Sequence, residues 1–214
     1  MPLYKTITVT PTTTVYIWKI EESYSTLEST LSEVEGRQKL TRNSLDRLDN
    51  MKSELHKRGF MSVRHLLAEA GYTDHDLFYS EAGKPHLTDG KHISITHSYI
   101  FSAIIVSDKA VGIDIEKQRD KILRIARKFT PLEEYLTLNT SEARVRKLTI
   151  VWGAKESIYK LYAQAGLSFR KHIDVQDFDF EDGKTTAKVY YNGNQSSYSI
   201  TFEEFEGFTM VYAV

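Results

Sequence analysis

The pattern of apolar and polar positions in the first half of the chain predicts strand, helices and strands, in that order. Apolar and polar residues alternate over residues 14–20, which is the period of a half-buried strand. Over residues 27–70 the apolar positions recur at helical spacing, so we expect two or three helices, the last ending at Gly71. Three short apolar runs follow at residues 92–97, 99–106 and 110–116, and we expect them to form an antiparallel meander.

The same coarse order of elements recurs in the second half. Residues 117–138 have helical character, and residues 141–165 form the longest helical stretch, which Gly166 ends. From Ile173 onward alternation returns, so the chain is expected to close in antiparallel strands. The two series divide near Lys109, and no linker rich in proline or glycine separates them.

Composition narrows the class of protein. The 214 residues can bury a core without disulfides, and the absence of cysteine removes cysteine nucleophiles, thiolate zinc sites and iron–sulfur clusters. With 28 basic and 29 acidic residues the net charge is −1, so no overall field favours nucleic acid or a membrane surface. The most apolar stretch, residues 99–106, is far shorter than the about 20 residues that span a bilayer. We therefore expect a cytoplasmic protein.

Two acidic residues lie on one face of the strand predicted at residues 111–116. Side chains of a strand alternate between faces, so Asp114 and Glu116 share the face opposite the apolar one, with carboxylates about 7 Å apart. That separation suits two ligands of one hard cation, and Gly112 is expected to leave room beside them for a bulky ligand. A solvated strand face with ordinary acids is the alternative.

The long predicted helix carries a second group of polar residues. Trp152, Glu156 and Lys160 are successive i, i+4 neighbours and project from one side, with Lys155 beside them. Glu followed by Lys four residues later is also the commonest stabilising surface pair on helices. The surrounding stretch is apolar nearly all round, however, so we expect these charges at the edge of a buried region, where a metal and a phosphate would supply their partners.

The remaining candidates are cationic. Arg64, Lys84 and His97 matter only as a set, because a histidine at a strand end is more often structural than a ligand. Residues 117–128 hold six basic residues against one acid, Asp120, which indicates a docking patch for an acidic partner, with a solvated helix face as the alternative. The six are Lys117, Arg119, Lys121, Arg124, Arg127 and Lys128.

Together these motifs resemble the 4′-phosphopantetheinyl transferase superfamily, and specifically its larger class, typified by the surfactin-synthetase activating enzyme. Their order and spacing match over about residues 50–170. The segments that carry the resemblance are Gly83-Lys84-Pro85, Ile95-Thr96-His97-Ser98, Gly112-Ile113-Asp114-Ile115-Glu116, and Trp152-x-x-Lys155-Glu156-Ser157 with Lys160.

The resemblance implies an α+β fold of two similar lobes related by a pseudo-twofold axis, each a small antiparallel sheet packed with helices. Residues 1–108 would form the lobe that binds the 3′-phosphate and adenine of coenzyme A. Residues 109–214 would carry the metal, the catalytic helix and the carrier-docking surface. The smaller class of this family uses chains about half this length and builds each active site between two subunits. Resemblance to the larger class therefore implies a monomer with one active site.

The activity implied is transfer of the phosphopantetheine arm of coenzyme A, the co-substrate, to a serine of an apo acyl or peptidyl carrier protein, releasing 3′,5′-ADP. The carriers of this family serve fatty-acid, polyketide or nonribosomal-peptide synthesis. By the same resemblance Asp114, Glu116 and Glu156 would bind Mg²⁺, with Mn²⁺ left open, and Glu156 would be the general base. Lys160 and Lys155 would stabilise phosphate charge, Asp114 would also face the pyrophosphate, Arg64 and His97 would bind the 3′-phosphate, and Lys84 and Pro85 would line the adenine.

The sequence departs from the family pattern at two places. Tyr99 follows the His-Ser pair where family members often have glycine, and of the early basic residues only Arg64 aligns, with Lys57 and Arg58 as further candidates. Two other functions stay open: a catalytically silent module that binds the carrier or coenzyme A, and a Mg²⁺-dependent phosphoanhydride hydrolase. The first requires loss of the acidic or lysine positions, which are present, and the second has no use for a basic docking patch.

Overall fold

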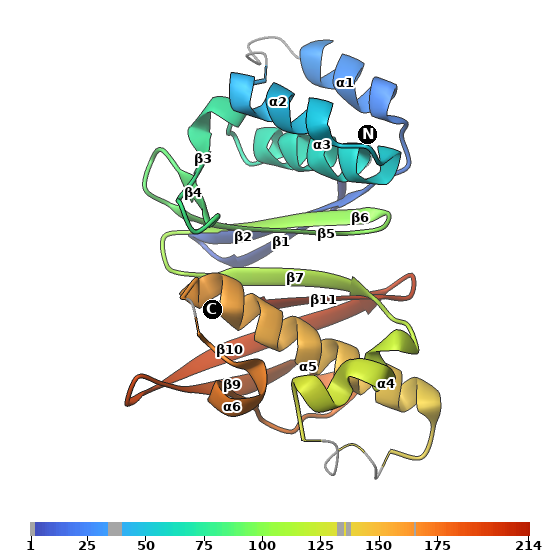
Figure 1. Ribbon diagram of the computed structural model, residues 1–214, viewed down its shortest axis with the longest axis vertical. Coiled ribbons are helices and arrows are strands. Elements are labelled where there is room, and N and C mark those ends of the chain that lie inside the picture. The colour runs from blue at the N-terminus through green and yellow to red at the C-terminus, as the bar shows by residue number, and fades with distance from the viewer. Residues whose placement is uncertain (1–2, 34–39, 132–134, 136–137, 165) are drawn as a thin grey trace. The chain divides into compact units, whose positions relative to one another are not determined.

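A computed structural model describes residues 3–33, 40–131, 135, 138–164 and 166–214. The chain divides into two compact units, Met1–Ala110 and Val111–Val214. Each unit contains one antiparallel sheet packed with helices (Figure 1), which confirms the predicted α+β class. Within the described part of the chain, no helix is both long and apolar enough to cross a membrane.

The sheet of the first unit has the strand order β1-β2-β6-β5-β4-β3, and every neighbouring pair is antiparallel. Its strands are β1 (Leu3–Thr10), β2 (Thr13–Lys19), β3 (Leu77–Tyr79), β4 (Pro85–Leu87), β5 (His92–Ser98) and β6 (Phe101–Ser107). The short strands β3 and β4 were not predicted, because three residues are too few to show an alternating pattern.

The helices of the first unit lie on one side of this sheet (Figure 1). They are α1 (Tyr24–Glu33), α2 (Arg42–Asn50) and α3 (Glu54–Glu69), followed by the short helix η1 (Asp74–Asp76). Helix α3 packs against β2, β5 and β6, and the core between them includes Trp18, Leu66 and Ile104. Gly71 follows α3 with φ of +84°, as a helix-terminating glycine does.

The second unit has the strand order β7-β11-β10-β9-β8, again antiparallel throughout. Its strands are β7 (Gly112–Lys117), β8 (Ile173–Val175), β9 (Lys184–Tyr191), β10 (Asn194–Phe205) and β11 (Phe208–Ala213). Its helices are α4 (Lys121–Ile125), η2 (Ala126–Lys128), α5 (Ser141–Tyr162), α6 (Phe169–His172) and η4 (Phe180–Asp182). The predicted closing strands are confirmed.

Helix α5 packs directly against β7 and β11. A Cβ on Gly112 would lie only 1.8 Å from the carbonyl oxygen of Ser157, and one on Gly153 would lie 2.6 Å from Val211 Cγ2. The two glycines therefore let the helix approach the sheet closely. The expectation that Gly112 leaves room for a bulky ligand is wrong, because the backbone of α5 fills that space.

The predicted three-strand meander is also wrong in its last strand. Strands β5 and β6 pair as expected, but β7 pairs with β11, in a register that joins Glu116 to Thr209. The physical reason is that both edges of β6 are already taken, by β2 and β5. The apolar run at residues 110–116 predicts a strand, but it does not predict which strand pairs with it. Pairing depends on which strand edges are free in the folded protein.

The longest predicted helix is shorter in the structure. Helix α5 ends at Tyr162, and Ala163 follows with φ of +48°, a left-handed conformation that stops the helix. Ala165, the predicted end, lies outside the described residues. Of the helical character expected over residues 117–138, the structure shows α4 and η2, while residues 132–134 and 136–137 lie outside its description.

Candidate active site

The acidic residues of β7 lie on the face of the strand that α5 covers. The close approach of Gly112 to α5 identifies this face, and strand alternation places Asp114 and Glu116 on it as well. Asp114 is only 6% exposed and Glu116 is half-buried. Glu156 of α5 is also half-buried. This face of β7 therefore packs against the helix. It is not the solvated strand face that the sequence left open as an alternative.

The electrostatics of Glu156 show that these three carboxylates are neighbours. Burial and the negative charge of Asp114 together raise the pKa of Glu156 to about 7, and Glu116 adds to the increase while Lys160 opposes it. A carboxyl group with a pKa near 7 exchanges a proton readily at neutral pH. Glu156 thus has the acid–base character that a proton-transfer step requires.

Lys160 joins α5 to β7 across this acidic face. Its Nζ donates to Asp114 Oδ1 at 2.8 Å and to the carbonyl oxygen of Ile113 at 2.9 Å. The lysine is therefore not simply the surface partner of Glu156 that its i, i+4 spacing allows. It places a positive charge among the carboxylates, as a residue that stabilises phosphate charge would.

Lys155 lies elsewhere. It is only 2% exposed, and its Nζ donates to the carbonyl oxygens of Phe169, at 2.8 Å, and Ile173, at 2.6 Å. These contacts tie the segment around α6 to α5. They give Lys155 a structural role and do not support the expected contact with a phosphate.

The basic segment 117–128 is exposed at all six of its basic side chains. It begins at the end of β7 and continues through α4 and η2. Beside it lies a pocket of about 190 Å³ whose walls include Glu116, Lys117, Arg119, Lys121, Ile122 and Trp152. The surface thus combines basic side chains with a small pocket that has both polar and apolar residues in its wall.

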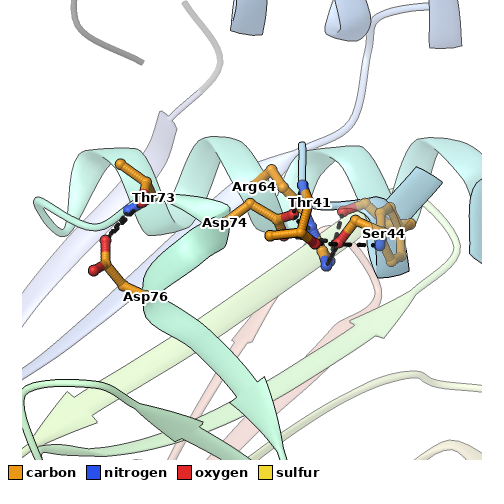
Figure 2. Close-up of polar contacts among 7 residues, drawn as sticks. Thr41, Ser44, Arg64, Thr73, Asp74 and Asp76 are labelled. Carbon is orange, nitrogen blue, oxygen red and sulfur yellow. Dashed lines mark hydrogen bonds and ion pairs between the residues drawn. The ribbon is translucent and has the colours of Figure 1, made fainter. Parts of the chain in front are cut away.

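Arg64 of the first unit belongs to a buried polar network (Figure 2). Its Nε donates to Asp74 Oδ1 at 2.9 Å, and both side chains are 4% exposed. Ser44 Oγ donates to the same carboxylate oxygen at 2.9 Å and accepts from Arg64 Nη2 at 3.0 Å. Thr41, the residue that caps α2, donates to Asp74 Oδ2 through both its N–H and its hydroxyl, each at 2.8 Å.

The network also determines the ionisation of its members. Burial by itself would raise the pKa of Asp74, but the charge of Arg64 and the hydrogen bonds from Thr41 and Ser44 outweigh it and lower that pKa. Burial likewise lowers the pKa of Arg64. Arg64 and Asp74 form a buried ion pair, and Arg64 also donates to Ser44 Oγ and to the carbonyl oxygen of Phe60, so its contacts are structural.

A pocket of about 350 Å³ in the first unit has Arg64 and His97 in its wall, whereas Lys84, the third member of the predicted set, does not line it. The ring of His97 lies against Gly59, where an added Cβ would be 2.6 Å from His97 Cδ2. The charged, polar and aromatic residues in its wall are Arg47, His56, Phe60, Arg64, Tyr79 and His97.

Lys84 lies in the loop before β4, and Pro85 is the first residue of that strand. Lys84 is half-buried, and this burial lowers its pKa. The neighbouring Gly83 borders a second cavity, of about 650 Å³, whose wall also includes Arg47, Arg64 and Tyr79. These three residues also line the pocket beside His97, so the loop lies close to residues that line both cavities.

Apart from Arg64, the basic residues of the early helices that line the pocket beside His97 are not those that the sequence suggested. Lys57 lies over the ring of Tyr24, and Arg58 donates to the carbonyl oxygen of Ile20 at 2.7 Å, so neither lines the pocket. Arg47, which sequence reasoning missed, does line it. Its helical position, three residues after the buried Ser44, was the available signal, because i, i+3 neighbours share a side of the helix.

Tyr99 has φ of +53°, in the left-handed region. Glycine adopts this conformation without cost, whereas other residues rarely do. The turn between β5 and β6 thus explains in physical terms why a glycine suits this position. Tyrosine accepts the same backbone conformation here.

Comparison with known proteins agrees with this geometry. Residues 110–213 match the model of the 4′-phosphopantetheinyl transferase superfamily. The chain is 27% identical over 132 residues to the 4′-phosphopantetheinyl transferase gsp of Aneurinibacillus migulanus, a match that covers 60% of this chain and 54% of that protein. It is 26% identical over 134 residues to the 4′-phosphopantetheinyl transferase of Bacillus subtilis, covering 61% of this chain and 58% of that protein.

Residues 110–213 are thus similar to the 4′-phosphopantetheinyl transferase superfamily, and the resemblance found in the sequence is confirmed. The matched segment contains the acidic strand β7 and the helix α5 that covers it. The match spans little more than half the length of the two curated relatives.

Proposed function

We propose that this protein is a 4′-phosphopantetheinyl transferase that moves the phosphopantetheine arm of coenzyme A to a serine of an apo acyl or peptidyl carrier protein. The observation that carries the proposal is the arrangement at β7 and α5, where Lys160 binds Asp114 and the acidic neighbours raise the pKa of Glu156 to about 7. This arrangement lies inside the segment that matches the superfamily.

In the proposed reaction the serine hydroxyl oxygen attacks the phosphorus that bears the pantetheine arm. A phosphodiester bond to the serine forms, the phosphoanhydride bond breaks, and 3′,5′-ADP leaves with the electron pair of that bond. The serine proton passes to Glu156, directly or through a bound water. A cation held by the same carboxylate would lower its pKa, because a nearby positive charge favours the ionised form. Lys160 supplies positive charge beside the phosphate oxygens, and charge neutralisation is what phosphoryl-type transfer chiefly needs.

The donor chemistry of this face fits Mg²⁺ or Mn²⁺, hard cations that prefer carboxylate oxygens. We assign Asp114, Glu116 and Glu156 as the residues that would hold the cation, which would polarise the pyrophosphate. Among the residues that the structure describes, no three His, Asp or Glu side chains form a ready-made metal site. Mg²⁺ usually takes one or two carboxylates and completes its shell with water and substrate phosphate, so its binding is expected to depend on coenzyme A.

The carrier protein is proposed to dock at the basic segment 117–128. Its six cationic side chains are exposed, and the adjoining pocket offers Ile122 and Trp152 to an apolar side chain. An acidic helix that presents an apolar residue beside its modified serine matches both features. Electrostatic complementarity of this kind speeds association and selects the partner.

Mass spectrometry of purified apo carriers tests the proposal. Incubation of fatty-acid, polyketide and nonribosomal-peptide carriers with coenzyme A and Mg²⁺ should add one phosphopantetheine group to at least one of them. Glu156→Gln should abolish the addition, and Glu142→Gln, an exposed acid on the same helix, should not. The absence of any mass gain with every carrier class would refute the transferase.

Controls without a carrier separate the alternative functions. A hydrolase would consume coenzyme A and release 3′,5′-ADP in the absence of any acceptor protein. A silent module would bind coenzyme A or carrier and leave both unchanged.

A further inference from the structure

The basic segment 117–128 is held in place where it leaves β7. The residue that holds it there is Gln118, which is half-buried. Its backbone N–H donates to the carbonyl oxygen of Gly207, at 2.9 Å, in the turn between β10 and β11. Its side-chain Nε2 donates to Glu204 Oε1 at 2.5 Å and to Thr209 Oγ1 at 3.0 Å. The hairpin of β10 and β11 therefore fixes the first residues of the segment.

Glu204 is itself held by the long helix α5. Arg146 binds its carboxylate through two nitrogens, with Nη2 2.6 Å from Oε2 and Nε 3.0 Å from Oε1. The Cζ of Arg146 also lies 4.2 Å from the centroid of the Phe180 ring. A bidentate arginine–carboxylate pair fixes direction as well as distance. Glu204 thus links Gln118 to a helix whose apolar side chains form part of the core of the second unit.

The segment is also held where it ends. Phe129, the next residue, is 1% exposed, and its ring centroid lies 5.1 Å from that of Trp152. Between the two ends, α4 has no buried residue and contributes only partly buried apolar side chains to the core. Because α4 buries little of its own surface, its orientation depends strongly on where its two ends are attached.

The charge of Glu204 acts against docking at the basic segment. An acid beside a surface that attracts an acidic partner lowers the positive potential there and should slow association. Its two polar contacts, to Gln118 and to Arg146, provide a role that offsets this cost. The charge and the contacts of Glu204 therefore predict opposite results for its removal.

We infer that Glu204 is a positioning residue for the carrier protein: acting through Gln118, it holds the basic segment in the orientation that the carrier meets. The inference rests on the proposed function, which supplies the partner, an acidic carrier protein. Glu204 acts at one end of the docking surface and not on the reacting groups. Its loss should therefore affect the KM for the carrier and leave kcat and the KM for coenzyme A.

Steady-state kinetics of three variants test the inference. Glu204→Ala should raise the KM for the carrier about tenfold, the value of about one hydrogen bond, with kcat and the KM for coenzyme A within about twofold of the wild type. Gln118→Ala should have a similar effect with no change of charge. The double variant should be no worse than either single one, because both substitutions remove the same contact.

Two control variants accompany these measurements. Glu142→Ala removes an exposed acid one turn before Arg146, and so removes the same charge without loss of the contact to Gln118. It should leave the KM for the carrier unchanged or slightly lower, the direction expected when only charge is lost. Gln195→Ala, at an exposed position of β10, should resemble the wild type. A general loss of stability would instead reduce the active fraction, which lowers kcat and leaves both KM values.

Hydrogen exchange in the absence of a carrier tests the positioning independently of the activity. Backbone amides of residues 118–128 should exchange several-fold faster in Glu204→Ala than in the wild type. An unchanged exchange rate, a KM for the carrier that stays the same or falls in Glu204→Ala, or additive effects in the double variant would each overturn the inference and leave the transferase proposal intact. If exchange is faster but the wild type modifies no carrier, the segment is held as inferred and the transferase proposal fails.

Discussion

Single residues in this protein carry roles that depend on what surrounds them. Asp74 is a buried carboxylate and Glu156 a half-buried one, and their pKa values move in opposite directions. For Asp74 the charge of Arg64 and several hydrogen bonds outweigh burial, whereas for Glu156 burial and the neighbouring acids act together. The first carboxylate stays ionised and structural, and the second can exchange a proton.

Asp74 should make folding stability depend on pH. Its pKa is lowered in the folded protein, so the unfolded chain binds more protons, and the stabilisation is present above the unfolded pKa and lost as pH falls through the folded pKa. At neutral pH Asp74→Asn should lower the free energy of unfolding by about 3–5 kcal/mol, because it leaves Arg64 buried without its partner. Urea unfolding at pH 7 and pH 3 measures both effects.

Asp46→Asn is the matched control, since it removes an exposed carboxylate that pairs with Arg42. It should change the free energy of unfolding by less than about 1 kcal/mol. Equal effects of the two substitutions at pH 7 would contradict the role given to Asp74.

Lys155 should affect stability more than its motif suggests. Lys155→Met removes the donor to one buried and one part-buried carbonyl oxygen and should lower the free energy of unfolding by about 2–3 kcal/mol. Lys171→Met, at an exposed position of α6, should have little effect. Thermal or urea unfolding checks both. An unchanged stability of Lys155→Met together with weakened coenzyme A binding would restore the phosphate-binding role.

At the scale of elements, the contact between α5 and β7 places the acidic face. Gly112→Ala should lower the free energy of unfolding by about 3 kcal/mol or more, because the added Cβ would lie 1.8 Å from the backbone of Ser157 and must push the helix away. Gly90→Ala adds a Cβ that meets nothing within 4 Å, at φ of +83°, so it should cost only about 1–2 kcal/mol of backbone strain. Unfolding curves that do not separate the two variants would contradict this view of Gly112.

The elements themselves follow largely from local pattern. The spacing of apolar residues and the residues that end helices predicted α3, α5 and the strands after Ile173. Both kinds of signal depend only on residues that are neighbours in the sequence. The partner of β7 could not be predicted, because it depends on which strand edge is free in the folded unit. The end of α5 was placed too late, because Ala163 takes a left-handed conformation that its side chain does not favour.

At the scale of the whole molecule, the near-zero net charge conceals local charge. Reversal of Arg124 and Arg127 to glutamate should raise the KM for the carrier several-fold and leave the KM for coenzyme A nearly unchanged, because only the carrier is proposed to meet this segment. Reversal of Lys91 and Lys184, which are exposed outside it, is the control. An equal rise of both KM values would show that the segment is not a docking surface, and steady-state kinetics at low salt measure the difference.

The sequence by itself determined the residue types of the candidate site and the resemblance to the superfamily, because the acidic strand motif and the helix motif each lie within a short segment. The tertiary structure alone decided which groups those residues contact. The ion pair of Arg64 with Asp74, the carbonyl contacts of Lys155 and the raised pKa of Glu156 depend on atoms brought together by packing. Burial and short-range electrostatics act through distance in space, which the order of residues along a chain does not contain.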